Sequence, residues 1–367
     1  MTKITDPPAP TMATIEPLAH YLLPIQRLIE LFESGRLDRV QSIEVEPEYG
    51  RVARILYKDG HVRIIHDHGF GVNRADAAYV ARDKGLTKHF LERLGYRTPT
   101  GQIFCSRRWQ QRVGPNLARS GSTGAPGVDQ IIPYIHRTLT YPCIIKPSDG
   151  SLGEGVFKCF DDTETRAAIE SHAQEGYRFT LVEQFVTLPL YRVNVWKREL
   201  MYCGRRVPLQ LRGDGRSSIE HLLTQHLDAL RLRRPGVSLQ PDDPRLDWAL
   251  RRRGLDSSSI PKDGESVVFD ECMTFPLGGD IVDLTTQVHP YWRDLCMNLT
   301  RDMGLLLAGI DLFCADITED EADYRVLEVN AAPRMANYAT TGSEADRRTH
   351  ALFLRLLNGE ALDEPRG

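Results

Sequence analysis

Residues 305–330 contain two apolar segments, and each of them carries a carboxylate in its middle. LLLAGIDLFC places Asp311 among apolar residues, and YRVLEVN places Glu328 two positions before Asn330. Because side chains alternate along a strand, Glu328 and Asn330 point to the same face. A buried carboxylate is costly unless a cation or a metal compensates it. The pattern therefore predicts two adjacent strands that hold either Mg²⁺ through oxygen ligands or an internal ion pair with an arginine.

A second pattern joins a lysine to a glycine-rich turn. Lys146 ends the apolar segment CIIKP, and SDGSLGEG follows it directly. A lysine beside such a turn can hold phosphate oxygens by charge while backbone N–H groups surround them. The turn supplies Gly150, Ser151, Gly153 and Gly155 for this purpose. The alternative is an ordinary hairpin loop with a lysine at the surface.

Two further segments carry polar residues in predicted regular structure. Lys88 lies in RDKGLTKHFLERLGYRTPTG, where a helix ends at Leu94-Gly95, and its alternative interpretation is plain exposure to solvent. Glu183 lies in LVEQFV, where apolar neighbours indicate a strand. An acid and an amide in this position suit a pocket for an adenine edge, but for Glu183 taken without context a surface acid at a strand end fits better.

Several classes of protein are excluded or disfavoured. No GxGxxG opens a helix and no GxxxxGK[ST] occurs, so the Rossmann and P-loop types of nucleotide site do not fit. The net charge of −4 argues against general binding to nucleic acids or membrane surfaces. No run reaches the ~18 uncharged apolar residues of a membrane span. Seven scattered cysteines without a CxxC pair indicate reduced thiols and a cytoplasmic protein.

The order of elements is mixed rather than a regular βα alternation. After a Pro- and Thr-rich lead-in at 1–16, a helix is predicted within 17–34, followed by short strands with a hairpin turn at Asp59-Gly60. Further helices are expected at 75–94, 162–174, 217–253, 290–302 and 343–357. Further strands are expected at 142–147, 156–160, 178–186, 191–196, 265–270, 305–315 and 324–330, and a surface loop at 114–127.

The order and spacing of these motifs resemble the ATP-grasp superfamily of carboxylate–amine ligases. The likeness is closest to the ATP-grasp part of cyanophycin synthetases and to the glutathione-synthetase-like half of bifunctional glutathione enzymes. It covers about residues 75–360 and also includes the segments YRVNV, RRVPLQLRGDGRSSIEHLL and GGDIVDLTTQVHP.

The resemblance implies an α+β, ATP-grasp fold in which ATP is clamped between two α+β lobes. We expect a smaller N-terminal lobe at 17–85, a central lobe with the glycine-rich loop at 86–186, and a C-terminal lobe with the metal site at 187–360. The lead-in at 1–16 is expected to be disordered.

The resemblance also implies roles for individual residues, where they match. Lys88 and Lys146 would hold the α and β phosphates, and the loop with Ser151, Gly153 and Gly155 would cover the β and γ phosphates. Glu183, Gln184 and Val186 would line the adenine. Arg192 and Arg206 would be catalytic, facing the γ-phosphate or an acyl phosphate. Asp311, Glu328 and Asn330 would hold Mg²⁺ or Mn²⁺.

Three positions depart from the family's pattern. Leu190 stands where relatives usually carry an acid that binds the ribose hydroxyls, Glu154 stands in the loop where cyanophycin synthetases have a basic residue, and Arg334 stands after NAAP where a glycine is usual. The first departure leaves ribose recognition open, and the third affects the turn on the substrate side.

These features predict a cytoplasmic, ATP-dependent ligase that forms an amide or peptide bond through an acyl phosphate and releases ADP and phosphate. Its partners would be a small-molecule acid and an amine, either amino acids or a short peptide, with no nucleic acid and no membrane. A homo-oligomer is one option for the assembly. The alternative function is a nucleotide-binding regulatory protein that keeps the ATP-grasp fold with little or no turnover.

Overall fold

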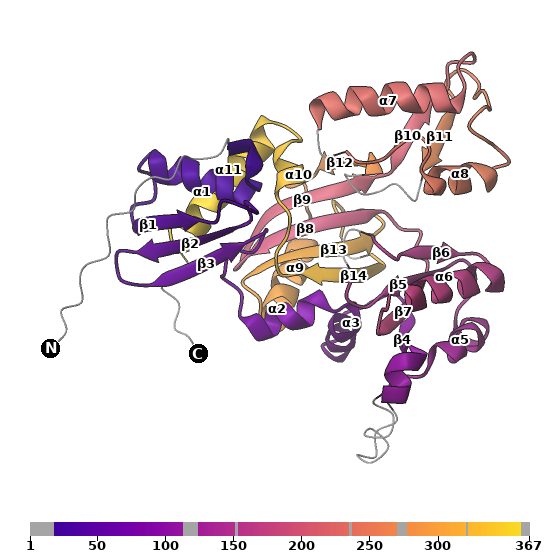
Figure 1. Cartoon of the computed structure of the whole chain (residues 1–367), viewed down its shortest axis with the longest axis horizontal. Helices are drawn as coiled ribbons and strands as arrows, with labels where there is room; N and C mark the ends of the chain where they lie inside the picture. The colour runs from indigo at the N-terminus through magenta and orange to yellow at the C-terminus, as the bar shows by residue number, and fades with distance from the viewer. Residues whose placement is uncertain are drawn as a thin grey trace. The chain divides into compact units, whose positions relative to one another are not determined.

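The chain divides into two compact units. The computed structural model describes residues 18–112, 124–150, 153–234, 237–269, 277–320 and 322–360 (Figure 1). One unit combines Met1–Val72 with Arg334–Gly367, and the other comprises Asn73–Pro333. The predictions for the lead-in at 1–16 and for most of the loop at 114–127 lie outside the described residues. Among the helices described, none has the length and apolar character that a membrane span requires.

The first unit is a three-stranded antiparallel sheet packed against helices from both ends of the chain. Its elements are β1 (Val40–Val45), β2 (Val52–Tyr57), β3 (Val62–His66), η1 (Leu18–His20), α1 (Leu23–Glu33), α10 (Ala336–Ala339) and α11 (Ser343–Leu357). The Tyr57 hydroxyl donates to the Leu357 carbonyl at 3.0 Å, and Arg63 donates to the Leu356 carbonyl at 2.7 Å. Residues after 333, which the sequence prediction assigned to the C-terminal lobe, thus fold with the N-terminal segment. The division into three lobes stays a prediction.

The second unit contains a four-stranded antiparallel sheet in the order β4-β7-β5-β6. Its strands are β4 (Gly101–Cys105), β7 (Phe179–Gln184), β5 (Cys143–Pro147) and β6 (Phe157–Cys159), and its helices are η2 (Val128–Gln130), α5 (Ile131–Thr138) and α6 (Asp162–Gln174). The helices pack Ile135 and Ala168 against Ile145 and Val182 of the sheet. Lys146 lies at the end of β5, where the chain leaves this core and the glycine-rich loop begins.

The same unit contains a five-stranded antiparallel sheet in the order β12-β9-β8-β13-β14. Its strands are β12 (Asp280–Asp283), β9 (Glu199–Val207), β8 (Leu190–Trp196), β13 (Leu307–Cys314) and β14 (Tyr324–Asn330). Alternate residues such as Val193, Ile310 and Val329 form a core with α9 (Pro290–Asp302), α2 (Ala75–Arg82) and α3 (Lys84–Arg93). Because side chains alternate, the residues between them project to the opposite face of the sheet, and that face carries the polar residues.

A small subdomain completes this unit. The hairpin of β10 (Leu209–Arg212) and β11 (Ser266–Phe269) packs with α7 (Ile219–Arg233) and α8 (Pro244–Arg251) around a separate apolar core. The mixture of helices with purely antiparallel sheets confirms the predicted α+β class.

Candidate functional site

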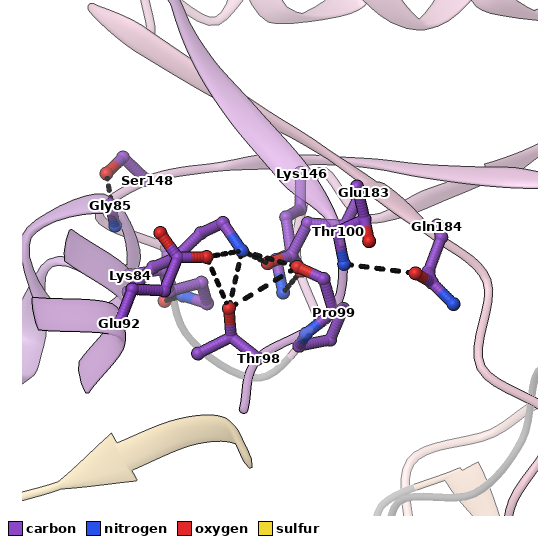
Figure 2. Close-up of polar contacts among 12 residues, drawn as sticks. Lys84, Gly85, Glu92, Thr98, Pro99, Thr100, Lys146, Ser148, Glu183 and Gln184 are labelled. Atoms are coloured by element: carbon purple, nitrogen blue, oxygen red, sulfur yellow. Dashed lines mark hydrogen bonds and ion pairs between the residues drawn. The ribbon is translucent and has the colours of Figure 1, made fainter. Parts of the chain in front are cut away.

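Lys146 and Glu183 form a buried ion pair on neighbouring strands. The Lys146 Nζ lies 2.6 Å from Glu183 Oε2, and the two residues are 4% and 2% exposed. β5 and β7 are adjacent, so both side chains arise from the same sheet (Figure 2). Two unpaired charges at such depth would each carry a large desolvation cost, which the pair offsets. The alternatives of a surface lysine and a surface acid are therefore wrong for these two residues.

Lys88 lies on the other side of Glu183 and is also buried. Its Nζ is 2.7 Å from Thr98 Oγ1, 2.8 Å from Glu92 Oε1 and 4.0 Å from Glu183 Oε1, and it also donates to the Pro99 carbonyl. The alternative of plain solvent exposure is therefore wrong. Protein oxygens surround this ammonium, and those of Thr98 and Pro99 belong to the segment before β4. Lys88 therefore ties α3 to that segment. Its phosphate role stays a prediction.

Gly101 makes room for the Glu183 side chain. The two residues are directly opposite in the β4–β7 ladder. A Cβ on Gly101 would lie 2.5 Å from Glu183 Cγ and 2.6 Å from the Val182 carbonyl oxygen. Since the second neighbour is backbone, the ladder itself would have to shift.

We therefore expect Gly101→Ala to lower the free energy of unfolding by roughly 1–3 kcal/mol, as overpacking does in a close-packed interior. Urea unfolding of the whole chain measures it. Gly342→Ala is the matched control, because Gly342 has extended backbone and nothing within 4 Å of the added Cβ. Equal stability of the two variants would contradict this account of the packing.

Gln184 and Val186, the other residues predicted to line the adenine, lie at and beyond the end of β7. The Gln184 backbone N–H donates to the Thr100 carbonyl at 2.8 Å, and its side-chain Oε1 accepts from the Thr100 N–H at 3.1 Å (Figure 2). Both residues are half-buried. The segment after Glu183 is thus held firmly to the end of the connection that precedes β4, and the adenine contact stays a prediction.

Lys84 belongs to the site although the sequence analysis did not single it out. Its Nζ donates to the Gly150 carbonyl at 2.5 Å, and its backbone N–H donates to the Ser148 carbonyl at 2.8 Å. Burial lowers the pKa of Lys84, although the Glu328 carboxylate acts in the opposite direction. Lys84 thus joins the start of α3 to the glycine-rich loop and lies in the electrostatic range of Glu328.

A sequence signal for Lys84 was present. Asp83 accepts the Leu86 N–H at 2.9 Å as the N-cap of α3, and it also accepts the Ser148 hydroxyl at 2.5 Å. Lys84 and Lys88 are four residues apart, so they share one face of this helix. The chain has only eight lysines against thirty-eight arginines, so two lysines on one helix face are unusual. The N-cap acid directly before Lys84 marks the start of that helix, and the sequence thus indicates Lys84 as well as Lys88 as a candidate site residue.

The glycine-rich loop uses backbone conformations that favour glycine. Gly153 and Gly155 have φ values of 78° and 66°, a region that side chains with a Cβ rarely adopt. Gly155 also packs against Pro147 and Tyr177, each 3.2 Å from where its Cβ would lie. The predicted Ser151 lies outside the described residues. The described part of the loop therefore allows the close backbone approach that the sequence predicts.

The five-stranded sheet carries a second group of charges on its polar face. Asp311 of β13 is directly opposite Glu328 of β14 and directly opposite Arg192 of β8. Arg192 donates to both Asp311 oxygens at 2.5 and 2.7 Å and lies 3.7 Å from Glu328 Oε1. The predicted shared face is confirmed. The alternative of an internal ion pair with an arginine is also found, because Arg192 forms a bidentate pair with Asp311.

These charges shift one another's pKa values. Burial raises the pKa of Asp311, but the ion pair with Arg192 outweighs burial and holds this pKa below its usual range. Burial, together with the neighbouring Asp311 carboxylate, raises the pKa of Glu328. Asn330 donates its amide to Glu328 Oε1 at 2.9 Å. A carboxylate whose ionisation is disfavoured by a neighbouring carboxylate is a natural ligand for a divalent cation.

Gly309 lets Arg192 cross the sheet. A Cβ at this position would lie 3.2 Å from Arg192 Nη1, 2.9 Å from Asn194 Oδ1 and 2.7 Å from the Pro333 Cβ. The guanidinium therefore lies over β13 where that strand has no side chain, and this brings it between Asp311 and Glu328.

The Arg206 side chain, unlike that of Arg192, forms no hydrogen bond or ion pair with another described residue. Burial, together with the nearby Arg192, lowers the pKa of Arg206, although the Asp311 and Glu328 carboxylates act in the opposite direction. A half-buried cation without a direct ion pair favours a bound anion. In the described segments, no group of three or more His, Cys, Asp or Glu side chains is arranged to hold a metal, so a cation here would depend on two carboxylates, the Asn330 amide and oxygens from outside the protein.

Two kinds of known protein have sequences similar to that of this chain. No protein-family model matches the chain. The glutathione biosynthesis bifunctional protein of Clostridium perfringens is 26% identical over 224 residues, which are 58% of this chain and 28% of that protein. Cyanophycin synthetase of Trichormus variabilis is 28% identical over 283 residues, which are 74% of this chain and 30% of that protein. The chain thus spans less than a third of the length of these relatives.

The solved structures show the fold. The crystal structure of a bifunctional glutathione synthetase from Pasteurella multocida superposes on 94% of this chain and 44% of its own length, with a TM-score of 0.56 at 19% sequence identity.

Proposed function

We propose, from the ATP-grasp fold that the chain has, that it is an ATP-dependent ligase joining a carboxylate to an amine. The observation that carries the proposal is the pair of charged groups in one unit: Lys146 and Glu183 beside the glycine-rich loop, and Asp311 and Glu328 with two arginines on the polar face of the sheet. Lys84 lies within electrostatic range of both.

The lysines beside the loop would hold the phosphates of ATP. Lys146 and Lys84 flank the loop, and a phosphate oxygen could replace the Gly150 carbonyl as the acceptor of Lys84. Lys88 is enclosed by Thr98, Pro99 and Glu92. We therefore assign its main effect to holding Glu183 and the segment that precedes β4. The loop glycines would let backbone N–H groups approach the β and γ phosphates.

The oxygen ligands on the sheet fit Mg²⁺. Asp311, Glu328 and Asn330 supply hard oxygen donors, and Mg²⁺ usually completes such a partial set with water and substrate phosphates. When bound, the ion would neutralise charge on the transferring phosphoryl group. Arg192 currently occupies both oxygens of Asp311, so it would share that carboxylate with the ion.

The two arginines would act on the reacting groups. In the first step the γ-phosphoryl group moves from ATP to a carboxylate oxygen, which gives ADP and an acyl phosphate. In the second, an amine attacks the acyl carbon, phosphate leaves with the electron pair of the broken C–O bond, and the amine loses a proton. Arg206, whose guanidinium has no direct ion pair among the described residues, would stabilise the phosphoryl oxygens, and Arg192 would hold Asp311 in place.

The relatives suggest the class of substrate. Their names refer to glutathione biosynthesis and to cyanophycin synthesis, and both products are built from amino acids. We propose that the acid and the amine are amino acids or short peptides.

One observation favours a second candidate. The bidentate pair of Arg192 with Asp311 satisfies the carboxylate without a metal, as would suit a nucleotide-binding regulatory protein with little or no turnover. A phosphate-release screen with MgATP over paired amino acids and dipeptides tests both candidates. Release that needs an acid and an amine, and that Mg²⁺ or Mn²⁺ but not Zn²⁺ supports, is the expected result. ATP binding without release for any pair would favour the regulator.

Leu190 leads to a prediction about ribose. It begins β8 opposite Phe313, and its side chain cannot accept a hydrogen bond. Each lost hydrogen bond is worth about 0.5–1.5 kcal/mol, so removing the 2′-hydroxyl should cost little. We expect the KM for 2′-deoxy-ATP to stay within about tenfold of that for ATP, and Leu190→Glu to widen the gap. A larger gap in the unmodified chain would mean that another residue holds the ribose.

A further inference from the structure

His172 connects helix α6 to the end of the glycine-rich loop. It is 3% exposed. Its Nε2 lies 2.7 Å from the Gly155 carbonyl oxygen, and its Nδ1 lies 2.9 Å from Thr180 Oγ1. Because a carbonyl can only accept, Nε2 must carry the proton, and a neutral ring then accepts the Thr180 hydroxyl at Nδ1. Burial lowers the pKa of His172, in keeping with the neutral form.

The contacts around the imidazole fix its orientation. The Tyr177 ring lies edge-on at 5.1 Å between centroids, and the Phe157 ring lies at 5.7 Å. Both ring nitrogens have a hydrogen-bond partner, and both partners lie next to Pro147. Gly155 is packed against Pro147, and Thr180 is paired with Pro147 in the β5–β7 ladder.

These contacts place the imidazole at a junction of the candidate site. Pro147 directly follows Lys146, and Thr180 lies three residues before Glu183 on β7. The ring therefore ties the far end of the loop to the strands that carry the buried ion pair. Among the site residues discussed above, Lys84 contacts the start of the loop at Gly150, whereas His172 contacts its far end at Gly155.

We propose that His172 is a positioning residue that holds residues 153–155 of the glycine-rich loop in the conformation that binds the phosphates of the nucleotide. The inference rests on the proposed function. Its Nε2–H donates to the Gly155 carbonyl and so fixes this end of the loop to α6. Loss of this bond should free the loop while leaving the charged groups intact.

Three variants test the proposal. His172→Leu removes the donor, whereas His172→Gln keeps an N–H that can reach the Gly155 carbonyl. His136→Leu is the matched control, because His136 also contacts α6, through Asp162 at 2.9 Å, but lies at the surface. Amide hydrogen exchange of residues 153–156 in the nucleotide-free chain and steady-state kinetics in ATP are the two measurements.

We expect His172→Leu to exchange these amides several times faster and to raise the KM for MgATP roughly tenfold, the upper range for one hydrogen bond, with a smaller change in kcat. His172→Gln and His136→Leu should resemble the unmodified chain in both measurements. A role confined to stability would lower the melting temperature without this separation of KM from kcat.

Unchanged exchange in the loop of His172→Leu, or failure of His172→Gln to rescue it, would overturn the proposal. If His172→Leu does not fold, Thr180→Val supplies the test, because it removes the hydroxyl that fixes the tautomer and should speed exchange of the loop by a smaller factor. Absence of ATP binding in the unmodified chain would instead refute the proposed function, and that result is visible without any variant.

Discussion

Replacing Lys146 with methionine is expected to reduce kcat/KM for ATP by roughly 100- to 1,000-fold, the range seen when one key electrostatic contact to a transition state is lost. Methionine keeps the length of the side chain but removes its charge. Lys146 lies at the base of the glycine-rich loop, so phosphate charge would lose its nearest buried cation. Phosphate release with the best acid and amine pair is the measurement.

The partner of Lys146 complicates the experiment and also supplies its control. Glu183 would be left as a buried carboxylate 2.6 Å from the missing ammonium, and breaking a buried pair in this way costs about 3–5 kcal/mol of stability. The double variant Lys146→Met with Glu183→Gln removes both charges. It should recover much of the stability in urea unfolding without recovering activity. Near-normal turnover by Lys146→Met would refute its phosphate role.

Asp311→Asn is expected to lose several kcal/mol of transition-state stabilisation, on the order of 100-fold or more in rate, and to need more Mg²⁺ for half-maximal activity. The amide keeps the shape of the carboxylate but is a poor ligand for a hard cation. Asp316→Asn is the matched control, since Asp316 lies two residues beyond β13, is exposed and hydrogen-bonds only Thr318 among the described residues. Mg²⁺ titration of phosphate release compares the two.

A double variant separates a metal ligand from a structural ion pair. Arg192→Met with Asp311→Leu removes both members of the bidentate pair, and hydrophobic replacements of buried pairs are often neutral or stabilising. If the pair served stability alone, the double variant would regain activity together with stability. We expect stability to return without activity.

The sequence predicted the parts of the fold that rest on local patterns. The period of two in residues 324–330 placed Glu328 and Asn330 on one face, and the hydrogen bond from the Asn330 amide to Glu328 Oε1 confirms it. The ladder between β13 and β14 adds Asp311 directly opposite Glu328. The helix at 162–174 matches α6, where the Asp161 side chain caps the first turn. Alternating strands and capped helices carry their signal in neighbouring residues, so they can be recognised without the tertiary structure.

The remaining features depend on contacts between distant residues. Lys88 is buried because Thr98 and Pro99 fold over it, and no helical period reveals that. The short strand β12 was missed because it forms only by pairing with β9. Arg192 was predicted to face phosphate, yet its nearest partner is Asp311, 119 positions away. The departures at Leu190 and Arg334 were visible in the sequence, but their effects depend on bound substrates.

The assembly of the first unit from both ends of the chain also has a consequence for how the protein is made. The hydrogen bonds from Tyr57 and Arg63 to the last turns of α11 span 300 and 293 positions, so the sheet β1–β3 cannot complete its core until α11 has left the ribosome. The second unit is continuous, from Asn73 to Pro333, and can fold earlier. Contacts this distant in sequence are slow to form, and the apolar face of the N-terminal sheet stays exposed to chaperones until α11 has been made.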